Sequence, residues 1–334
     1  MVRERGARPT VNDVAAAAGV SRALVSIVMR GVPGASDATR ERVLRIADDM
    51  GYVPDQRASK LRSASSTVLG VCFELREPFH GDLVEEIYAA AAELGRNVVI
   101  SAVAPSRSES VAVQTLLSER CESAILLGTR LSAADLTDLA EQLPVVTVLG
   151  DAVVETVGDV RGDDAAGIGL AVDHLVALGH RDIVHVDGGD APGSRVRRRA
   201  FLDAMAGHRR KGAARVVDGG LTALDGVRAT RGLLDGRAAP TAILAFNDEC
   251  ASGVIDVLIR SGLRVPEDVS VVGYDDARFA ATMPVPLTTV SQDARGLAAH
   301  AVASVRSMAE GADPGRVVVP PRLMVRETTA PPSR

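Results

Sequence analysis

The sequence predicts an α/β protein in which a small helical head precedes a body of two doubly wound parallel sheets. Two short helical segments joined by a glycine-containing turn lie near the N-terminus. From about residue 67 onward, short apolar runs rich in β-branched residues alternate with amphipathic segments. Such alternation is typical of parallel sheets that are covered by helices on both faces. The 334 residues suffice for two or three domains of about 100–200 residues each.

The head is predicted to contain three helices that share one small core. Thr10 and Asp13 have the spacing of a capping box, so the first helix begins at Val11. Gly19 permits the left-handed turn that ends this helix, and Ser21 can cap a second helix over 22–29. A third helix is expected between 37 and 50, where apolar residues recur with a period near 3.6. Two short helices joined in this way form a helix-turn-helix.

The outward positions of the second helix suit the major groove of DNA. Arg22 can donate two hydrogen bonds to guanine, Ser26 can contact bases or phosphate, and Ala23 can touch a thymine methyl group. Thr39 and Arg40 can donate to phosphates. The candidate DNA-binding residues of the head are Thr10, Val11, Asn12, Ser21, Arg22, Ala23, Ser26, Arg30 and Thr39. A helical bundle with a solvated cationic face remains the alternative at this point.

The charge distribution also favours a polyanionic partner for the head. Residues 1–65 contain eleven Lys and Arg against seven Asp and Glu, whereas the rest of the chain contains 27 against 36. A basic head on an acidic body is expected where the head meets nucleic acid.

Three stretches resemble, in order and spacing, the headpiece of the lactose repressor (LacI/GalR) family of bacterial transcription regulators: "TVNDVAAAAGVSRALVS", "SDATRERV" and "MGYVPDQRASKL". The resemblance continues through nearly the whole chain. It implies a DNA-binding headpiece over 1–53 and a hinge helix with a linker over 54–66. By motif match, Leu61 would insert into the minor groove, with Arg57 and Lys60 beside it. Leu24 and Ile27 stand where the family usually has Thr and Arg, so the operator sequence is not predicted.

The body is predicted to span 67–330 and to form two lobes. The expected strands are 67–74, 97–103, 123–128, 144–149, 182–187, 242–246 and 269–274. The two clearest helices are expected over 82–95 and 167–179. We place boundaries near Asp163 and Gln292, where the chain passes between lobes. The near lobe then comprises 67–163 and 293–319, and the far lobe 164–291 and 320–330.

Polar residues follow the predicted far-lobe strands, at the edge where open α/β sheets bind ligands. Asn247 and Asp248 lie in "FNDE", Asp275 and Asp276 in "GYDD", and Arg197 begins a helix. Such side chains, converging on one cleft, can bind several hydroxyl groups or a carboxylate. A helix cap is the simpler role for Asp276, and a solvated or core position is the simpler reading of His80 and His174.

The family resemblance implies a body like that of periplasmic sugar-binding proteins, with an effector held between two lobes. Motif by motif, the effector-binding candidates are Phe79, His80, Asp151, Arg197, Asn247, Asp275 and Gln292. Leu221 stands where sugar-binding members often have an aromatic residue. Gly128 and Gly150 stand where polar sugar contacts are common, although Thr129 and Asp151 are adjacent. A sugar is the expected class of effector, and a nucleoside, polyol or small acid remains open.

Several classes of protein are disfavoured by the sequence. It lacks a P-loop, a GxGxxG after a strand, a GxSxG and an HExxH, so we predict no enzymatic activity, no cofactor and no metal site. Its three cysteines are dispersed, which favours buried thiols over disulfides or zinc ligands. The N-terminus lacks an apolar signal region, and no run of about 18 apolar residues exists, so we expect a cytoplasmic protein without a membrane segment.

The sequence therefore predicts a homodimeric transcription repressor that binds double-stranded operator DNA and is controlled by a small-molecule effector. Each head would bind one half-site of a roughly palindromic operator. Whether the effector releases the DNA or promotes binding is left open, as are the effector and the regulated genes. The main alternative is a solute-binding protein without a regulatory role, since the body alone fits that function.

Overall fold

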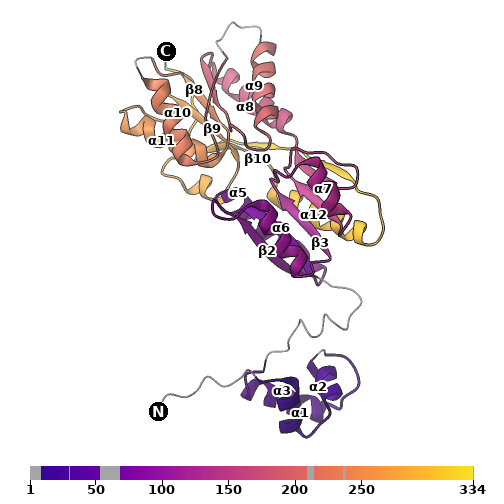
Figure 1. Ribbon diagram of the computed structural model, residues 1–334. Coiled ribbons are helices and arrows are strands. Elements are labelled where there is room, and N and C mark those ends of the chain that lie inside the picture. The colour runs from indigo at the N-terminus through magenta and orange to yellow at the C-terminus, as the bar shows by residue number, and fades with distance from the viewer. Residues whose placement is uncertain (1–8, 30, 53–67, 209–213, 236–237, 334) are drawn as a thin grey trace. The chain divides into compact units, whose positions relative to one another are not determined.

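The computed structural model (Figure 1) describes residues 9–29, 31–52, 68–208, 214–235 and 238–333. It divides into two compact units, 1–66 and 67–334. The predicted hinge and linker, and with them Arg57, Lys60 and Leu61, lie outside the described residues, as does Arg30.

The N-terminal unit contains the three predicted helices: α1 (Val11–Ala18), α2 (Arg22–Met29) and α3 (Asp37–Asp49). The backbone N–H of Thr10 donates to the Asp13 carboxylate over 2.7 Å, as in a capping box, and Gly19 ends α1 with a φ of 64°. Val14, Val25, Val28 and Val43 are buried together between the helices. The predicted helix-turn-helix is thus confirmed.

The near lobe is built on a six-stranded parallel sheet. Its strands, in spatial order, are β11 (Arg316–Val319), β5 (Gly158–Gly162), β4 (Val145–Val148), β3 (Ser123–Leu127), β1 (Val68–Glu74) and β2 (Asn97–Val103). Helices α5 (Pro78–Glu93) and α12 (Ala294–Ala309) bury apolar residues against one face, and α6 (Glu109–Ser118) and α7 (Ala133–Ala140) against the other. This is the doubly wound arrangement that the alternating sequence pattern predicts.

The far lobe has the same design. Its sheet has the spatial order β12 (Arg322–Met324), β10 (Thr288–Ser291), β9 (Ser270–Asp275), β8 (Ala242–Ala245), β6 (Ile183–Val186) and β7 (Arg215–Val217). All its pairings are parallel except that of β10 with β12. Helices α10 (Ala223–Leu234) and α11 (Asp248–Arg260) pack on one face, and α8 (Asp164–Leu178) and α9 (Ser194–Gly207) on the other (Figure 1).

The chain passes between the two lobes three times, after β5, after β10 and after β11. Because both sheets are parallel, the carboxyl ends of their strands carry the loops in which ligand-binding residues gather. β8 ends just before Asn247, and β9 ends at Asp275.

Three further features of the described chain concern function. Cys72, Cys121 and Cys250 are buried free thiols, as predicted. No single described helix has the length and apolar character that crossing a membrane requires. Only α1 and α2 taken together, with a bend of 104° between them, meet that requirement by length and composition.

Candidate functional site

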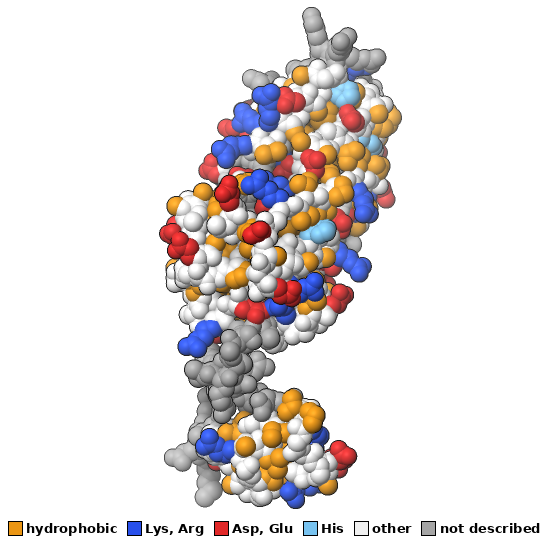
Figure 2. Space-filling view, turned by 90° about the vertical axis from the view of Figure 1, so that its right-hand side faces the viewer, with side chains coloured by type: hydrophobic (Ala, Val, Ile, Leu, Met, Phe, Trp, Pro, Cys, Tyr) orange, Lys and Arg blue, Asp and Glu red, His pale blue; other side chains and the backbone are white. Residues whose placement is uncertain are grey.

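The N-terminal unit exposes one face of α2. Arg22 and Ala23 are exposed and Ser26 is half-buried, while Val25 and Val28 on the opposite side enter the core. Ser21 accepts a hydrogen bond of 3.2 Å from the backbone N–H of Leu24, so it caps the helix as expected. Thr10 and Asn12, at the start of α1, are exposed beside Val11, which is half-buried. Figure 2 shows Lys and Arg side chains at the surface of this unit.

Two residues near α2 hold the turn that leads to α3. Ile27 is half-buried and lies next to Gly34, where an added Cβ would come within 3.3 Å of its side chain. Ile27 therefore packs against the turn at Gly34. Arg40 donates to the carbonyl oxygens of Val32 (2.9 Å) and Val28 (3.5 Å), so its guanidinium binds the turn, although we expected a phosphate contact. The Thr39 hydroxyl lies 2.9 Å from that of Ser36.

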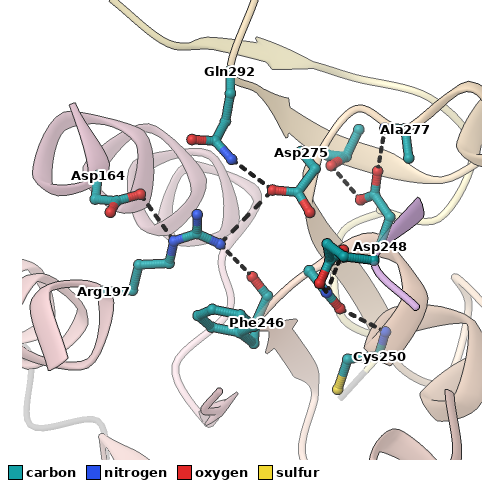
Figure 3. A network of polar contacts seen from close by, with 11 residues as sticks. Asp164, Arg197, Phe246, Asp248, Cys250, Asp275, Ala277 and Gln292 are labelled. Carbon is teal, nitrogen blue, oxygen red and sulfur yellow. Dashed lines mark hydrogen bonds and ion pairs between the residues drawn. The ribbon is translucent and has the colours of Figure 1, made fainter. Parts of the chain in front are cut away.

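In the body, Arg197 is the centre of a buried polar network (Figure 3). Its Nε donates to Asp164 over 2.9 Å and its NH1 to the carbonyl oxygen of Phe246 over 2.8 Å. Its Cζ lies 3.7 Å from the ring centroid of Tyr274 and 4.6 Å from that of Phe246. Burial alone would lower the pKa of Arg197, but Asp164 and Asp275 raise it above its ordinary value. The guanidinium is therefore a fixed, permanent charge.

Asp275 ends β9 beside this guanidinium. One of its carboxylate oxygens accepts a hydrogen bond of 2.7 Å from Gln292 and lies 3.9 Å from NH1 of Arg197. Burial raises the pKa of Asp275 to about 7, an effect that Arg197 and Gln292 oppose. A carboxylate held in this way can accept hydrogen bonds from ligand hydroxyl groups.

The neighbouring residue, Asp276, does not cap a helix, and that prediction is wrong. Its carboxylate forms an ion pair with Arg326, a residue of the chain's last segment. The short 3₁₀ helix η1 (Arg278–Thr282) begins after Ala277, with no side-chain cap. The arginine that determines the role of Asp276 lies 50 positions away in sequence.

Asn247 and Asp248 begin α11, and both have positioning contacts. Asn247 caps the helix by accepting a hydrogen bond of 2.8 Å from the backbone N–H of Cys250, so its amide Nδ2 is left to face the near lobe. Asp248 accepts hydrogen bonds from the N–H of Ala277 (2.8 Å) and the hydroxyl of Thr289 (2.5 Å). Asp248 thus holds the loop after Asp275, and its carboxylate lies where a Cβ on Gly273 would be.

The near lobe contributes Phe79 and His80 from the start of α5, and both are buried. His80 Nδ1 accepts a hydrogen bond of 3.1 Å from the backbone N–H of Glu74. Burial lowers the pKa of His80 to about 4, so the ring is neutral near pH 7. Its Nε2 faces Gly128, where an added Cβ would lie 2.9 Å away. The imidazole therefore occupies the space that a larger residue at position 128 would need.

Asp151 and Thr129, the polar residues next to the near-lobe glycines, have different surroundings. Asp151 accepts a hydrogen bond of 2.8 Å from the backbone N–H of Gly193, just before α9, so it reaches across the cleft to the far lobe. Thr129 donates to Glu109 over 2.5 Å within the near lobe and is 2% exposed. Of these two residues, Asp151 therefore joins the lobes and Thr129 does not.

Sequence reasoning missed two residues of this region, Glu77 and Asp164. Glu77 precedes α5, and both of its carboxylate oxygens lie 3.4 Å from Nδ2 of Asn247 in the far lobe. Burial, and next the charge of Asp275, raise the pKa of Glu77 to about 9. Asp164 pairs with Arg197, while Asp163 caps α8. An acidic residue just before "PFH" was the available signal for Glu77, but its partner is 170 positions away.

A cavity of about 210 Å³ lies between α5, the end of β9 and the start of α12. Phe79, Asp82 and Asp275 are among its lining residues. Arg278 closes one side by donating to Asp82 (2.6 Å) and to Glu85, which joins η1 of the far lobe to α5. The lobes thus enclose a polar cleft that can hold a small hydroxylated or charged molecule.

Two family models match the chain. Residues 10–55 match the bacterial regulatory proteins of the lacI family, and residues 172–329 match the periplasmic binding protein-like domain. Among curated proteins, the transcriptional regulator DegA of Bacillus subtilis is 31% identical over 97% of this chain and 99% of its own length. The lactose operon repressor of Escherichia coli is 32% identical over 97% of this chain and 91% of its own.

Solved structures agree with these matches. A LacI transcriptional regulator from a Rhodococcus species is 53% identical and covers 79% of this chain and 98% of its own, with a TM-score of 0.77. The lac repressor dimer bound to operator and the anti-inducer ONPF is 30% identical over 97% of this chain and all of its own, with a TM-score of 0.83. The regulator CelR in complex with cellobiose is 30% identical and covers 96% of this chain and all of its own, with a TM-score of 0.70.

Proposed function

This chain belongs to the lacI family of bacterial DNA-binding transcriptional regulators, and from that premise we propose that it is a homodimeric repressor with an effector-binding cleft. Its operator would be roughly palindromic, with one half-site for each copy of α2. The lac repressor binds its operator as a dimer, and CelR forms a complex with cellobiose. A sugar or related metabolite is accordingly the proposed class of effector.

The observation that carries the effector part of this proposal is the buried cluster of Asn247 and Asp275, at strand ends of the far lobe, with Arg197 of α9. In ligand-binding clefts, a small number of fixed polar groups orient the ligand by hydrogen bonds. Phe79, His80, Asp151 and Gln292 complete the proposed effector site. The contacts that Asp151 and Arg278 make between the lobes depend on how the two lobes are oriented. A ligand that changes the orientation of the lobes would thereby change the affinity for DNA.

The DNA-binding part rests on the exposed face of α2 and on motif resemblance. Arg22, Ala23 and Ser26 are the proposed base contacts, and Thr10, Asn12 and Thr39 the proposed phosphate contacts. We further propose that 1–53 act as the headpiece, 54–66 as the hinge with Leu61 as its minor-groove wedge, and 67–330 as the effector-binding body. Since an operator is chromosomal, the cytoplasm is the proposed location.

A solute-binding protein without a regulatory role has no support among the relatives. Both curated relatives described above match over 97% of this chain, a span that includes the helix-turn-helix. DegA is a transcriptional regulator, and the other relative is the lactose operon repressor. The family consists of regulators and not of enzymes.

The experiment begins with the purified full-length protein and a pool of genomic DNA fragments. Fragments that the protein retains should share a palindromic site, and fluorescence anisotropy then measures affinity for it. Sugars, nucleosides and polyols that raise the melting temperature are added to test for a change in this affinity. Asp275→Ala should keep DNA binding and lose the effector response. Retention of no fragment by the wild type would refute the proposed function.

A further inference from the structure

The carboxylate of Glu77 lies between the two lobes, beside Asn247 of the proposed effector site, without an ion-pair partner among the described residues. Its two oxygens each lie 3.4 Å from Nδ2 of Asn247, at the long end of hydrogen bonding. Among the described residues, no Lys, Arg or His forms an ion pair with Glu77. Glu77 is half-buried, and these long contacts from one amide leave most of the acceptor capacity of its carboxylate unused, so the carboxylate can bind a donor from a ligand.

The surroundings of Glu77 carry a surplus of negative charge. Asp275, Glu249 and Glu74 all act on it as like charges, and Arg197 acts on it as an opposite charge. Arg197 is already bound to Asp164 at 2.9 Å and is more distant from Asp275, at 3.9 Å. At the cavity wall, Arg278 is likewise bound by Asp82 and Glu85. Arg197 and Arg278 are therefore each held by a closer carboxylate, and the carboxyl group of Glu77 has no cation of its own among the described residues.

This charge balance discriminates between classes of effector. A small acid would place its negative charge beside the carboxyl groups of Glu77 and Asp275, which is unfavourable at low dielectric when either of them is ionised. A neutral sugar would leave Glu77 to bind as a protonated acid. A ligand ammonium group would supply the missing positive charge and donate charge-assisted hydrogen bonds to the carboxylate. Asn247 and Asp275 are then free to bind its hydroxyl groups.

We propose that the effector is a hydroxylated molecule with a protonated amine, such as an amino sugar, whose ammonium group binds Glu77. This inference deepens the proposed function and rests on it, because it concerns the same cleft. It replaces the open choice among sugars, nucleosides, polyols and acids by one chemical class. Glu77 is the residue that sets the preference for the amine, and Arg197 and Asp275 serve as general anchors.

The test compares ligands that differ only in the amine. The probes are glucosamine with glucose, galactosamine with galactose, and mannosamine with mannose, each with the N-acetylated form, which keeps a nitrogen but loses its charge. Calorimetry with the full-length protein should give at least one amine that binds about tenfold or more tightly than its neutral counterparts, the difference expected for one charge-assisted hydrogen bond. Binding of neutral sugars with equal or higher affinity, or of no amine at all, overturns the proposal.

Variants connect the preference to Glu77. Glu77→Gln keeps the shape and removes the charge, so the ratio of amine to neutral affinity should fall to about one. Glu77→Asp keeps the charge and should retain part of the ratio. Glu93→Gln, an exposed position at the other end of α5, is the matched control and should leave the ratio unchanged. A ratio that survives in Glu77→Gln assigns the preference elsewhere and refutes the role of Glu77.

Failure of this inference is distinguishable from failure of the proposed function. The same samples are scored by anisotropy for operator binding. If a neutral sugar changes operator affinity and no amino sugar does, the amine proposal is wrong and the regulator stands. If no genomic fragment binds in any condition, the proposed function itself is wrong.

Discussion

The carboxylate of Asp248 accepts a hydrogen bond of 2.8 Å from the backbone N–H of Ala277, two residues beyond Asp275. Asp275 and Asp276 have φ angles of 111° and 59°, in a region that non-glycine residues rarely adopt. Such conformations cost roughly 1–3 kcal/mol each and persist where surrounding contacts hold them. Asp248, bound also to Thr289, supplies such a contact, so it positions Asp275, the proposed effector anchor.

Replacement of Asp248 by Ala should therefore destabilise the body by about 1–3 kcal/mol, because the N–H of Ala277 loses its buried partner. Urea unfolding measures this change. Asp256→Ala, in the same helix but at a side chain that is 45% exposed, is the control and should change stability by less than about 0.5 kcal/mol. Equal effects of the two substitutions would contradict the positioning role.

Arg22→Ala should relax operator preference at one base pair of each half-site. A bidentate arginine discriminates a correct from an incorrect base by about 1–3 kcal/mol. Anisotropy titrations with the operator and its single-base variants give this difference. Arg42→Ala, an exposed position on α3, should affect all DNA sequences alike. An unchanged base preference in the Arg22 variant would remove Arg22 from the base-reading face.

Glu77→Gln should alter the pH dependence of unfolding in a defined direction. The pKa of Glu77 is raised from 4.5 to about 9 in the folded state, so between these values only the unfolded state is ionised. Wild-type stability therefore falls as the pH rises through this window, with a slope that reaches about 1.4 kcal/mol per pH unit. The raised pKa of Asp275 likewise makes the folded state less stable as the pH rises, up to a pH of about 7.

The variant lacks the ionisable carboxyl group at position 77. The stability of Glu77→Gln minus that of the wild type should thus increase with pH from about 4.5 and level off near about 9. Urea unfolding of the ligand-free proteins at a series of pH values gives this difference. A difference that stays constant, or that shrinks as the pH rises, would show that Glu77 is ionised in the folded state.

Arg278→Ala should change ligand affinity more than stability. The Arg278 side chain is 69% exposed, so loss of its ion pairs with Asp82 and Glu85 should change stability by less than about 1 kcal/mol. These pairs join the two lobes, however, and their loss should weaken effector binding by up to about fivefold. Arg260→Ala, which breaks an exposed pair within α11, should leave calorimetric affinity unchanged. Identical affinities for both variants would argue against a role of Arg278 in lobe closure.

The sequence by itself determined the helices of the head and the general architecture of the body. The helix limits depend on local contacts, such as those of Thr10 with Asp13 and of Gly19 with the preceding turn, and local contacts are visible in a short stretch of sequence. The fully buried strands are predicted by continuous apolar runs in the sequence, as at β3. The positions of Asn247 and Asp275 after predicted strands, and the family motifs around them and Arg197, indicated the proposed far-lobe anchors.

Only the tertiary structure decided the short strands and the electrostatics of the cleft. β7, β11 and β12 have three or four residues with little burial, and they form because a distant strand offers them hydrogen bonds. The ion pair of Asp276 with Arg326 and the approach of Glu77 to Asn247 join residues 50 and 170 positions apart. A carboxylate's protonation and partners depend on burial and on neighbouring charges, and the fold alone brings those together.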